Sequence, residues 1–414
     1  MWGAAHVAAV TRCLNEMSPD EMTVPNQTTP SVNREPHAHP PVHTPSSLLD
    51  AVDVAPLFTP FSVGDLTLVN RFVMAPMTRS KSPGGVPGAD VAAYYARRAA
   101  QVGLIITEGT YVDHPAAGSS DRVPRFYGDD ALAGWAAVVA AVHAVGGRIM
   151  PQLWHIGATR AAGTPPHPDA PTLSPSGITL DGSTVGAAAT QAELDDLVAG
   201  FARSARAAQR LGFDGVEVHG AHGYLLDQFF WSATNRRTDA YGGTPENRSR
   251  LSAEIVAAMR REVGPTFPIV FRFSQWKVRQ YEAHSFETPQ ELERMLRPLT
   301  DAGVSMFHVS TRRYWLPGFD GSERTLAGWT KYVSGLPTIA IGSVGVDVPF
   351  LGQAEDAPAS LSLAPLLELF AAGEFDLVAV GRALISEPNW VGKLRNGQVE
   401  QIRAYEKAHE QTLE

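Results

Sequence analysis

The chain has 414 residues, of which 44% are hydrophobic and 19% charged, and its formal net charge is −9. This composition is typical of a globular enzyme, and the acidic balance argues against nucleic acid or an anionic membrane surface as a partner. Cys13, the single cysteine, excludes a disulfide framework, a thiolate zinc site and an iron–sulfur cluster. No apolar run approaches the roughly 18 residues of a membrane span. The first residues make a poor secretory signal, so we expect a cytoplasmic enzyme.

Residues 1–55 are predicted to form a disordered arm, because they are rich in Pro, Ser, Thr, Asn and His and contain few large apolar residues. His37, His39 and His43 resemble a metal-binding tract, but solvated histidines are the favoured interpretation in a flexible, Pro-rich arm. Met22 is an alternative start. Residues 56–399 then form one domain, and 400–414 a C-terminal helix or tail. The oligomeric state stays open, a homo-oligomer included.

The domain begins with a predicted hairpin over residues 56–70, whose Gly-Asp turn would close the bottom of a barrel. Short apolar strands then alternate with helix-length segments, the pattern of βαβ units. The predicted strands cover 72–77, 103–108, 148–155, 215–219, 268–274, 305–310, 337–343 and 376–380. The predicted helices lie near 90–101, 129–145, 191–211, 246–263, 288–302, 322–334, 360–373 and 388–397.

This alternation predicts an α/β fold of the (β/α)8 (TIM) barrel type. A doubly wound sheet is the alternative, and it is disfavoured because no G-x-G-x-x-G motif follows the first strand. Thr190 and Glu193 form a capping box that starts the third helix. The polar run 235–248 is interpreted as a structural capping loop, with Asn247 or Arg248 opening the next helix.

Polar residues gather near the carboxyl ends of three predicted strands. Side chains alternate faces along a strand, and this parity places Gln152, His219 and Arg272 on the inner side of the barrel. Burying such groups without partners is costly, so together they indicate a polar ligand at the barrel mouth. In the alternative interpretation, Arg272 is an internal ion-pair partner of Glu217.

The most informative stretch follows the strand over 215–219. His219, His222 and Tyr224 lie within six residues, so two histidines can donate hydrogen bonds to one carbonyl oxygen and a phenol can supply a proton nearby. A metal pair is disfavoured because no Asp or Glu stands beside them at ligand spacing.

The loops after the last two strands predict a phosphate site. In barrels, phosphate commonly binds at these loops beside a short helix, because glycines let backbone N–H groups approach and an arginine can bind in a bidentate manner. The residues concerned are Gly342, Ser343, Gly345, Gly381 and Arg382. The ligand is therefore predicted to carry one phosphate.

Several ordered motifs identify a resemblance over residues 56–399. They are Ala75-Pro-Met-Thr-Arg79, Thr107-Glu-Gly109, Gln152-Leu-Trp-His-x-Gly157, Gly215 to Leu226, Asn235 to Arg248 and Val380-Gly-Arg382. Through them the chain resembles the old yellow enzyme family of FMN-dependent ene-reductases (NADH:flavin oxidoreductases). The resemblance implies FMN, held noncovalently across the barrel mouth, and NADH or NADPH as the reductant, which needs no Rossmann motif.

The resemblance also implies which residues hold FMN. Those packed beside the flavin ring would be Ala75, Pro76, Met77, Thr78 and Gly109, with Thr78 near its O4 edge. Those at its pyrimidine part would be Gln152 and, beside N1 and O2, Arg272, where a cation stabilises the charge of the reduced flavin. Those at the phosphate would be the five glycine-loop and arginine residues named above.

An enone-type small molecule is the implied substrate. His219 and His222 would bind its carbonyl oxygen, hydride would pass from flavin N5 to the β-carbon, and Tyr224 would protonate the α-carbon. Trp276 would shape the pocket lid, because Ser274-Gln-Trp-Lys-Val-Arg279 replaces the commoner small and acidic residues.

Two other functions remain open at the level of the sequence. One is a non-redox barrel enzyme, an aldolase or isomerase that binds a phosphorylated metabolite. A Schiff-base lysine at a strand end would favour it, whereas Lys277 is predicted to lie beyond its strand in a loop. The other is an FMN-binding protein or isomerase without reductase activity, against which His219, His222 and Tyr224 argue.

Overall fold

The computed structural model describes residues 52–346 and 362–414. The predicted arm up to residue 51 and the tract from His37 to His43 lie outside the described residues, as do the first two residues of the predicted helix 360–373. In the part of the chain that the structure describes, no helix combines the length and apolar character needed to cross a membrane.

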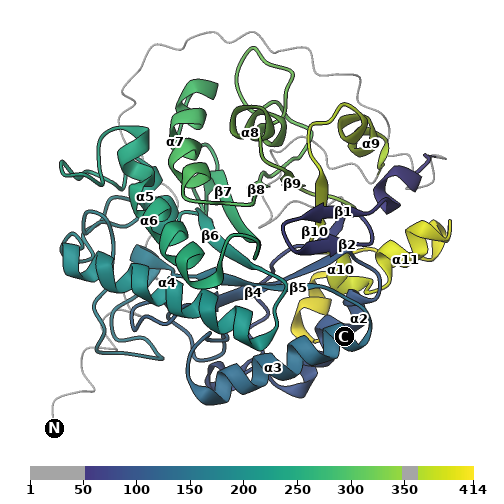
Figure 1. Cartoon of the computed structure of the whole chain (residues 1–414), viewed down its shortest axis with the longest axis horizontal. Coiled ribbons are helices and arrows are strands. Elements are labelled where there is room, and N and C mark those ends of the chain that lie inside the picture. Colours follow the sequence, from purple (N-terminus) through teal and green to yellow (C-terminus); the bar gives the residue numbers. More distant parts are fainter. Residues whose placement is uncertain (1–51, 347–361) are drawn as a thin grey trace, which may run out of the picture. The chain divides into compact units, whose positions relative to one another are not determined.

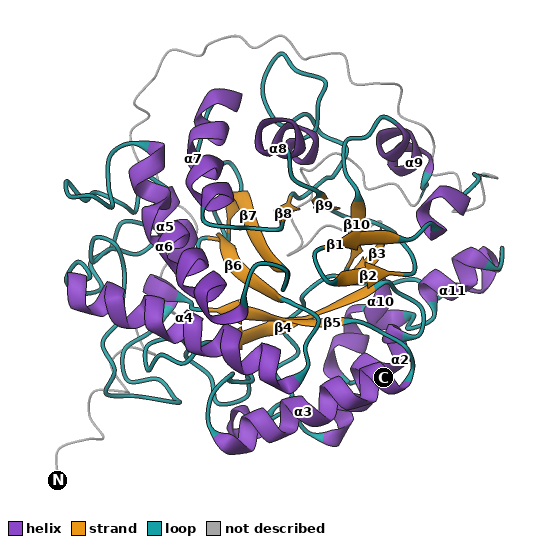
Figure 2. Cartoon of the chain, in the orientation of Figure 1, coloured by secondary structure: helices purple, strands orange, loops and turns teal. Residues whose placement is uncertain are grey.

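A closed barrel of eight parallel strands forms the centre of the fold, with helices around it (Figures 1 and 2). The strands are β3 (Phe72–Met74), β4 (Leu104–Tyr111), β5 (Ile149–Trp154), β6 (Val216–His222), β7 (Ile269–Lys277), β8 (Met306–Ser310), β9 (Thr338–Ile341) and β10 (Leu377–Val380). They follow the chain around the barrel, and β10 pairs with β3 to close it. The predicted (β/α)8 barrel is confirmed.

The helices that alternate with these strands overlap their predicted ranges. They are α2 (Ala89–Ala99), α3 (Asp129–Ala144), α4 (Gln191–Leu211), α6 (Pro245–Val263), α7 (Pro289–Asp301), α8 (Leu326–Ser334), α9 (Ala364–Ala371) and α11 (Trp390–Arg395). The predicted capping box is present: Glu193 N donates to Thr190 Oγ1 at 3.3 Å, and Thr190 N donates to the Glu193 carboxylate at 2.7 Å.

Some boundaries differ from the prediction. Helix α6 begins at Pro245 with Thr244 as its N-cap, so the expectation that Asn247 or Arg248 opens it is wrong. Two short helices, α5 (Leu225–Phe230) and α10 (Ala383–Ser386), were not predicted, because one or two turns are too short to show an apolar period. Residues 399–414 contain two 3-10 turns, at Val399–Gln401 and Lys407–Gln411.

The hairpin before the barrel closes its amino-terminal end, as predicted. Strands β1 (Phe61–Val63) and β2 (Leu66–Leu68) pair antiparallel, and Asp65 N donates to Thr266 O, just before β7, at 3.1 Å. Leu66 and Leu68 are buried in one apolar cluster with inward-facing residues such as Met150. Hydrocarbon therefore fills the lower part of the barrel, whereas polar side chains occupy its carboxyl end.

Gly64 in the hairpin turn should be sensitive to substitution. Its φ is +56°, and an added Cβ would meet Thr266 O at 2.2 Å. Gly64→Ala is expected to lower the free energy of unfolding by about 2 kcal/mol or more, from left-handed strain plus the clash. Gly146→Ala is the control, because its φ is +79° with nothing within 4 Å. Urea denaturation measures both; equal losses would show that the contact with Thr266 contributes nothing.

Candidate active site

The structure brings His219, His222 and Tyr224 together at the carboxyl end of β6. The His219 ring centroid lies 5.1 Å from that of His222 and 5.1 Å from that of Tyr224. Trp154, from the end of β5, packs edge-on against Tyr224 at 4.8 Å. The three predicted catalytic side chains therefore form one cluster at the end of the barrel where barrel enzymes carry their chemistry.

Hydrogen bonds fix the loop that carries this cluster. His222 has a left-handed backbone with φ +66°, which costs a non-glycine residue about 1 kcal/mol. Its N–H donates to Ser274 Oγ at 2.9 Å, and the next N–H, of Gly223, donates to Asp227 Oδ2 at 2.6 Å. The strained conformation is thus held by contacts with β7 and α5, as expected where a side chain must be aimed at a ligand.

Burial sets the protonation of the cluster. Burial lowers the pKa of His219 and of His222 well below the usual range, and the nearby charge of Arg272 lowers both further. Neutral imidazole has one donor nitrogen, and His219 Nδ1 accepts from Ala221 N at 3.3 Å, so its proton is on Nε2. Burial raises the pKa of Tyr224 to about 12, which keeps its phenol protonated. The cluster can therefore donate hydrogen bonds without carrying charge.

Arg272 lies beside this cluster on the inner face of β7. Its Nη2 donates to Ser310 Oγ at 3.2 Å, and the same oxygen lies 2.8 Å from His222 Nε2. Its Nε is buried and has no hydrogen-bond partner in residues 52–346 and 362–414. Burial lowers the pKa of Arg272 to about 10, so it remains charged at neutral pH. A buried cation with an unpartnered donor fits the electron-rich pyrimidine edge of FMN.

Glu217 does not form the alternative ion pair with Arg272. Its carboxylate accepts instead from His308 Nδ1 at 2.6 Å and from Gln152 Nε2 at 2.8 Å. Gln152 and Arg272 are therefore both inside the barrel, as the alternation along the strands predicted. They bind different partners: Gln152 donates to Glu217, and Arg272 donates to Ser310.

The motif at 75–78 lies beside the loop after β10, one of the two loops predicted to bind phosphate. A Cβ added at Gly381 would lie 3.6 Å from Met77 Sδ and 3.8 Å from the Cβ of Ala75. Near the other loop, Ser343 has φ +60°, and its Oγ accepts from Arg313 Nη1 at 2.7 Å. Two glycine loops with arginines are the donor set that a phosphate group needs, so the residues fit the FMN phosphate.

Two arginines lie near these loops, and the sequence analysis named only one of them, Arg382. Arg313, which follows β8, is buried and hydrogen-bonded to the phosphate loop. The predicted Arg382 lies over the ring of Tyr405, with its guanidinium carbon 5.3 Å from the centroid. The paired Arg312-Arg313 after a strand was the available signal, because cations at strand ends of a barrel often face the ligand.

Other placements modify the prediction. A Cβ at Gly109 would meet the Trp154 ring at 2.5 Å, so packing of the indole explains this glycine, and its role beside the flavin stays a prediction. Trp276 stacks on His222, with ring centroids 4.3 Å apart. This contact supports its predicted place at the pocket lid.

The prediction that Lys277 lies in a loop is wrong. Strand β7 continues to Lys277, which pairs with His222 after a bulge, a polar extension that apolar alternation does not reveal. The lysine is fully buried, and its Nζ contacts Asp227 Oδ1 at 2.8 Å and Ser285 Oγ at 2.8 Å, besides two backbone carbonyls. With its donors taken by protein acceptors, this amine does not suit Schiff-base chemistry.

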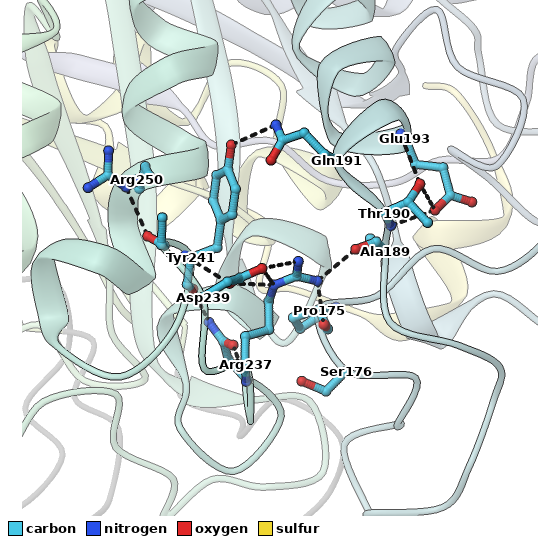
Figure 3. Close-up of polar contacts among 12 residues, drawn as sticks. Pro175, Ser176, Ala189, Thr190, Gln191, Glu193, Arg237, Asp239, Tyr241 and Arg250 are labelled. Carbon is cyan, nitrogen blue, oxygen red and sulfur yellow. Dashed lines mark hydrogen bonds and ion pairs between the residues drawn. The ribbon is translucent and has the colours of Figure 1, made fainter.

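The polar run 235–248 has a structural role, as predicted. Arg237 donates to Pro175 O at 3.0 Å and to Ala189 O at 2.7 Å, and it pairs with Asp239 (Figure 3). Gln191 Nε2 donates to Tyr241 Oη at 3.0 Å. These contacts tie the run to the start of α4. Over the described ranges, no group of three or more His, Cys, Asp or Glu side chains is arranged to hold a metal ion.

Comparisons with known proteins identify the family of the chain. The family model described as NADH:flavin oxidoreductase / NADH oxidase family matches residues 56–401. The chain is 40% identical to 12-oxophytodienoate reductase 1 of Oryza sativa subsp. japonica over 228 residues, 54% of this chain and 60% of that protein. It is 33% identical to the NADH oxidase of Thermoanaerobacter brockii over 352 residues, 84% of this chain and 52% of that protein. The chain thus spans less than two thirds of either relative.

A solved structure has the same architecture. Morphinone reductase in complex with tetrahydroNAD matches with a TM-score of 0.71 and 30% identity, over 86% of this chain and 93% of that one.

Lys277→Met should be strongly destabilising. It leaves the fully buried Asp227 carboxylate without its cation, at an expected cost of about 3–5 kcal/mol of unfolding free energy. Adding Asp227→Asn should recover part of that loss, because no unpaired charge then remains. Arg294→Met breaks the exposed pair with Glu246 and should cost less than about 1 kcal/mol. Urea denaturation of the variants measures these free energies of unfolding. Similar losses for the buried and the exposed pair would show that burial of the Asp227 charge is not the cause.

Glu108 should make stability depend on pH. Its Oε2 accepts the N–H groups of Arg79 and Ser80, which follow Thr78, and burial raises the pKa of Glu108 to about 7. Between about pH 4 and pH 7, Glu108 is protonated in the folded state and ionised in the unfolded state. The free energy of unfolding therefore falls as the pH rises through this range. Over that range wild type should lose about 3 kcal/mol relative to Glu108→Gln. Urea denaturation of both proteins from pH 4 to pH 8 measures the free energy of unfolding. If the two free energies change with pH in parallel, the pKa of Glu108 is not raised.

Proposed function

Because the chain belongs to the NADH:flavin oxidoreductase / NADH oxidase family, that of the old yellow enzymes, we propose that it reduces the C=C bond of α,β-unsaturated carbonyl compounds. FMN is the cofactor that family membership implies, with NADH or NADPH as reductant. The observation that carries the proposal is the neutral cluster of His219, His222 and Tyr224 beside the buried, charged Arg272.

When bound, FMN supplies the hydride that the carbon–carbon double bond accepts. The two histidines bind the carbonyl oxygen of the substrate through N–H donors. Because His219 and His222 are neutral, they stabilise the charge that develops on this oxygen without forming an ion pair beforehand. Tyr224, protonated in its buried position, supplies the proton to the α-carbon.

Other side chains prepare this site. Arg272 would hold a positive charge beside the pyrimidine part of bound FMN, where it would stabilise negative charge. Trp154 and Trp276 pack against Tyr224 and His222 and exclude water from the reacting groups. The similarity to proteins named 12-oxophytodienoate reductase and morphinone reductase supports a carbonyl compound as the substrate. Family membership does not support the non-redox alternative. The Lys277 amine, whose donors are all hydrogen-bonded to the protein, is not available as a nucleophile for such a reaction.

A visible absorption spectrum of the purified protein tests the proposal first. Oxidised-flavin bands should bleach on anaerobic addition of NADPH and return when 2-cyclohexenone is added. A protein that binds FMN but whose bands do not return with any enone would be a flavin oxidase or isomerase. A protein that binds no flavin would end the proposal.

Tyr224→Phe should separate the two halves of the reaction. Loss of a general acid commonly slows a step by about 10²–10⁴-fold, so reoxidation by the enone should slow by that factor while reduction by NADPH is unchanged. Tyr127→Phe is the control, because that hydroxyl lies 3.1 Å from His167 and outside the cluster. Anaerobic stopped-flow absorbance measures both steps. An equal loss in the two steps would remove Tyr224 as the proton donor.

A further inference from the structure

A buried hydrogen-bonded triad lies inside the barrel below the active-site cluster. Gln152 on β5, Glu217 on β6 and His308 on β8 are 3%, 0% and 0% exposed. The Glu217 carboxylate joins the other two: Oε1 lies 2.8 Å from Gln152 Nε2, and Oε2 lies 2.6 Å from His308 Nδ1. None of the catalytic steps above uses Glu217 or His308, although burying such groups is costly.

The chemistry of these groups fixes their hydrogen-bond directions. A carboxylate only accepts, so Gln152 must turn its NH2 group toward Glu217 and its Oε1 away from it. No described residue donates to that Oε1. Burial lowers the pKa of His308, so the ring is neutral and its proton is on Nδ1, facing Glu217. Its Nε2 is then a bare acceptor, which explains how it remains buried without a partner among the described residues.

Arg272 completes the polar pattern. It pairs in register with both His219 on β6 and His308 on β8, two residues further along the strands than Glu217, which pairs with Gln152 and Val270. A guanidinium only donates, whereas the Gln152 amide could in principle present either an oxygen or an NH2 group. Glu217 removes that choice, so the barrel interior contains one fixed acceptor, Gln152 Oε1, and one fixed cation, Arg272.

We propose that Glu217 and His308 are positioning residues that hold the Gln152 amide so that its Oε1 accepts the N3–H of the FMN pyrimidine ring. This inference rests on the proposed function. The N3–H is a donor between two carbonyl oxygens, so an amide turned the other way would place donor against donor. The pair therefore acts on the cofactor through Gln152 and touches neither substrate nor flavin itself.

The test uses protein loaded with 15N-labelled FMN and follows the N3–H proton by NMR. In wild type this proton should exchange with water at least ~10-fold more slowly than in free FMN, because it is hydrogen-bonded and buried. In Glu217→Gln, where the neighbouring side chain can donate as well as accept, the Gln152 amide is released to turn. Exchange should then accelerate about 10-fold, and FMN should bind about 10-fold more weakly by fluorescence quenching.

Two further variants make the result specific. Gln152→Ala removes the acceptor and should match Glu217→Gln in exchange rate. Glu374→Gln replaces another carboxyl that is hydrogen-bonded within the fold, one that accepts from Thr325 N and Oγ1, and should leave N3–H exchange unchanged. Unchanged N3–H protection in Glu217→Gln would overturn the inference while leaving the proposed function standing. If Glu217→Gln fails to fold, the wild-type protein still tests the inference. An N3–H proton that exchanges as fast in bound wild type as in free FMN would also overturn the inference. Absence of any bound flavin would instead be a failure of the proposed function.

Discussion

The buried charge of Arg272 is the constraint on which the rest of the site depends. A guanidinium inside a barrel must be balanced by charge or by acceptors. Here Ser310 supplies one hydrogen bond, whereas the Glu217 carboxylate is bonded to Gln152 and His308. The Arg272 charge also contributes to the lowered pKa of both active-site histidines. Burial and the charge of Arg272 together keep both histidines neutral.

The position of this charge follows from how the barrel is filled. The hairpin β1–β2 and inward residues such as Met150 fill the amino-terminal end with packed hydrocarbon. Polar inward positions can then be tolerated at the carboxyl end of the strands, where a ligand and the loops supply partners. The register of β5, β6, β7 and β8 places residues far apart in sequence side by side: Gln152 pairs with Glu217, and Arg272 pairs with both His219 and His308.

At the carboxyl end of β6, the turn that follows His222 is fixed by a buried ion pair. Asp227 accepts the Gly223 N–H and the Lys277 ammonium, which joins the turn between His222 and Tyr224 to the end of β7. Burial raises the pKa of Asp227 to about 6, and the lysine opposes this effect. A loop held this way can keep left-handed residues such as His222 in place, and side chains aimed at a substrate need that rigidity.

The sequence by itself determined the barrel, because eight apolar strands alternating with periodic helices leave few other ways to bury their faces. It also determined that Gln152, His219 and Arg272 face inward, because strand alternation is a local property. It could not determine that Lys277 ends a strand and meets Asp227, that Glu217 binds Gln152 and His308 rather than Arg272, or that Arg313 reaches the phosphate loop. Those pairings join residues up to 91 positions apart across the barrel. The sequence offers more than one acceptor for each of these donors. The register and curvature of the closed sheet determine which acceptor lies within hydrogen-bonding distance.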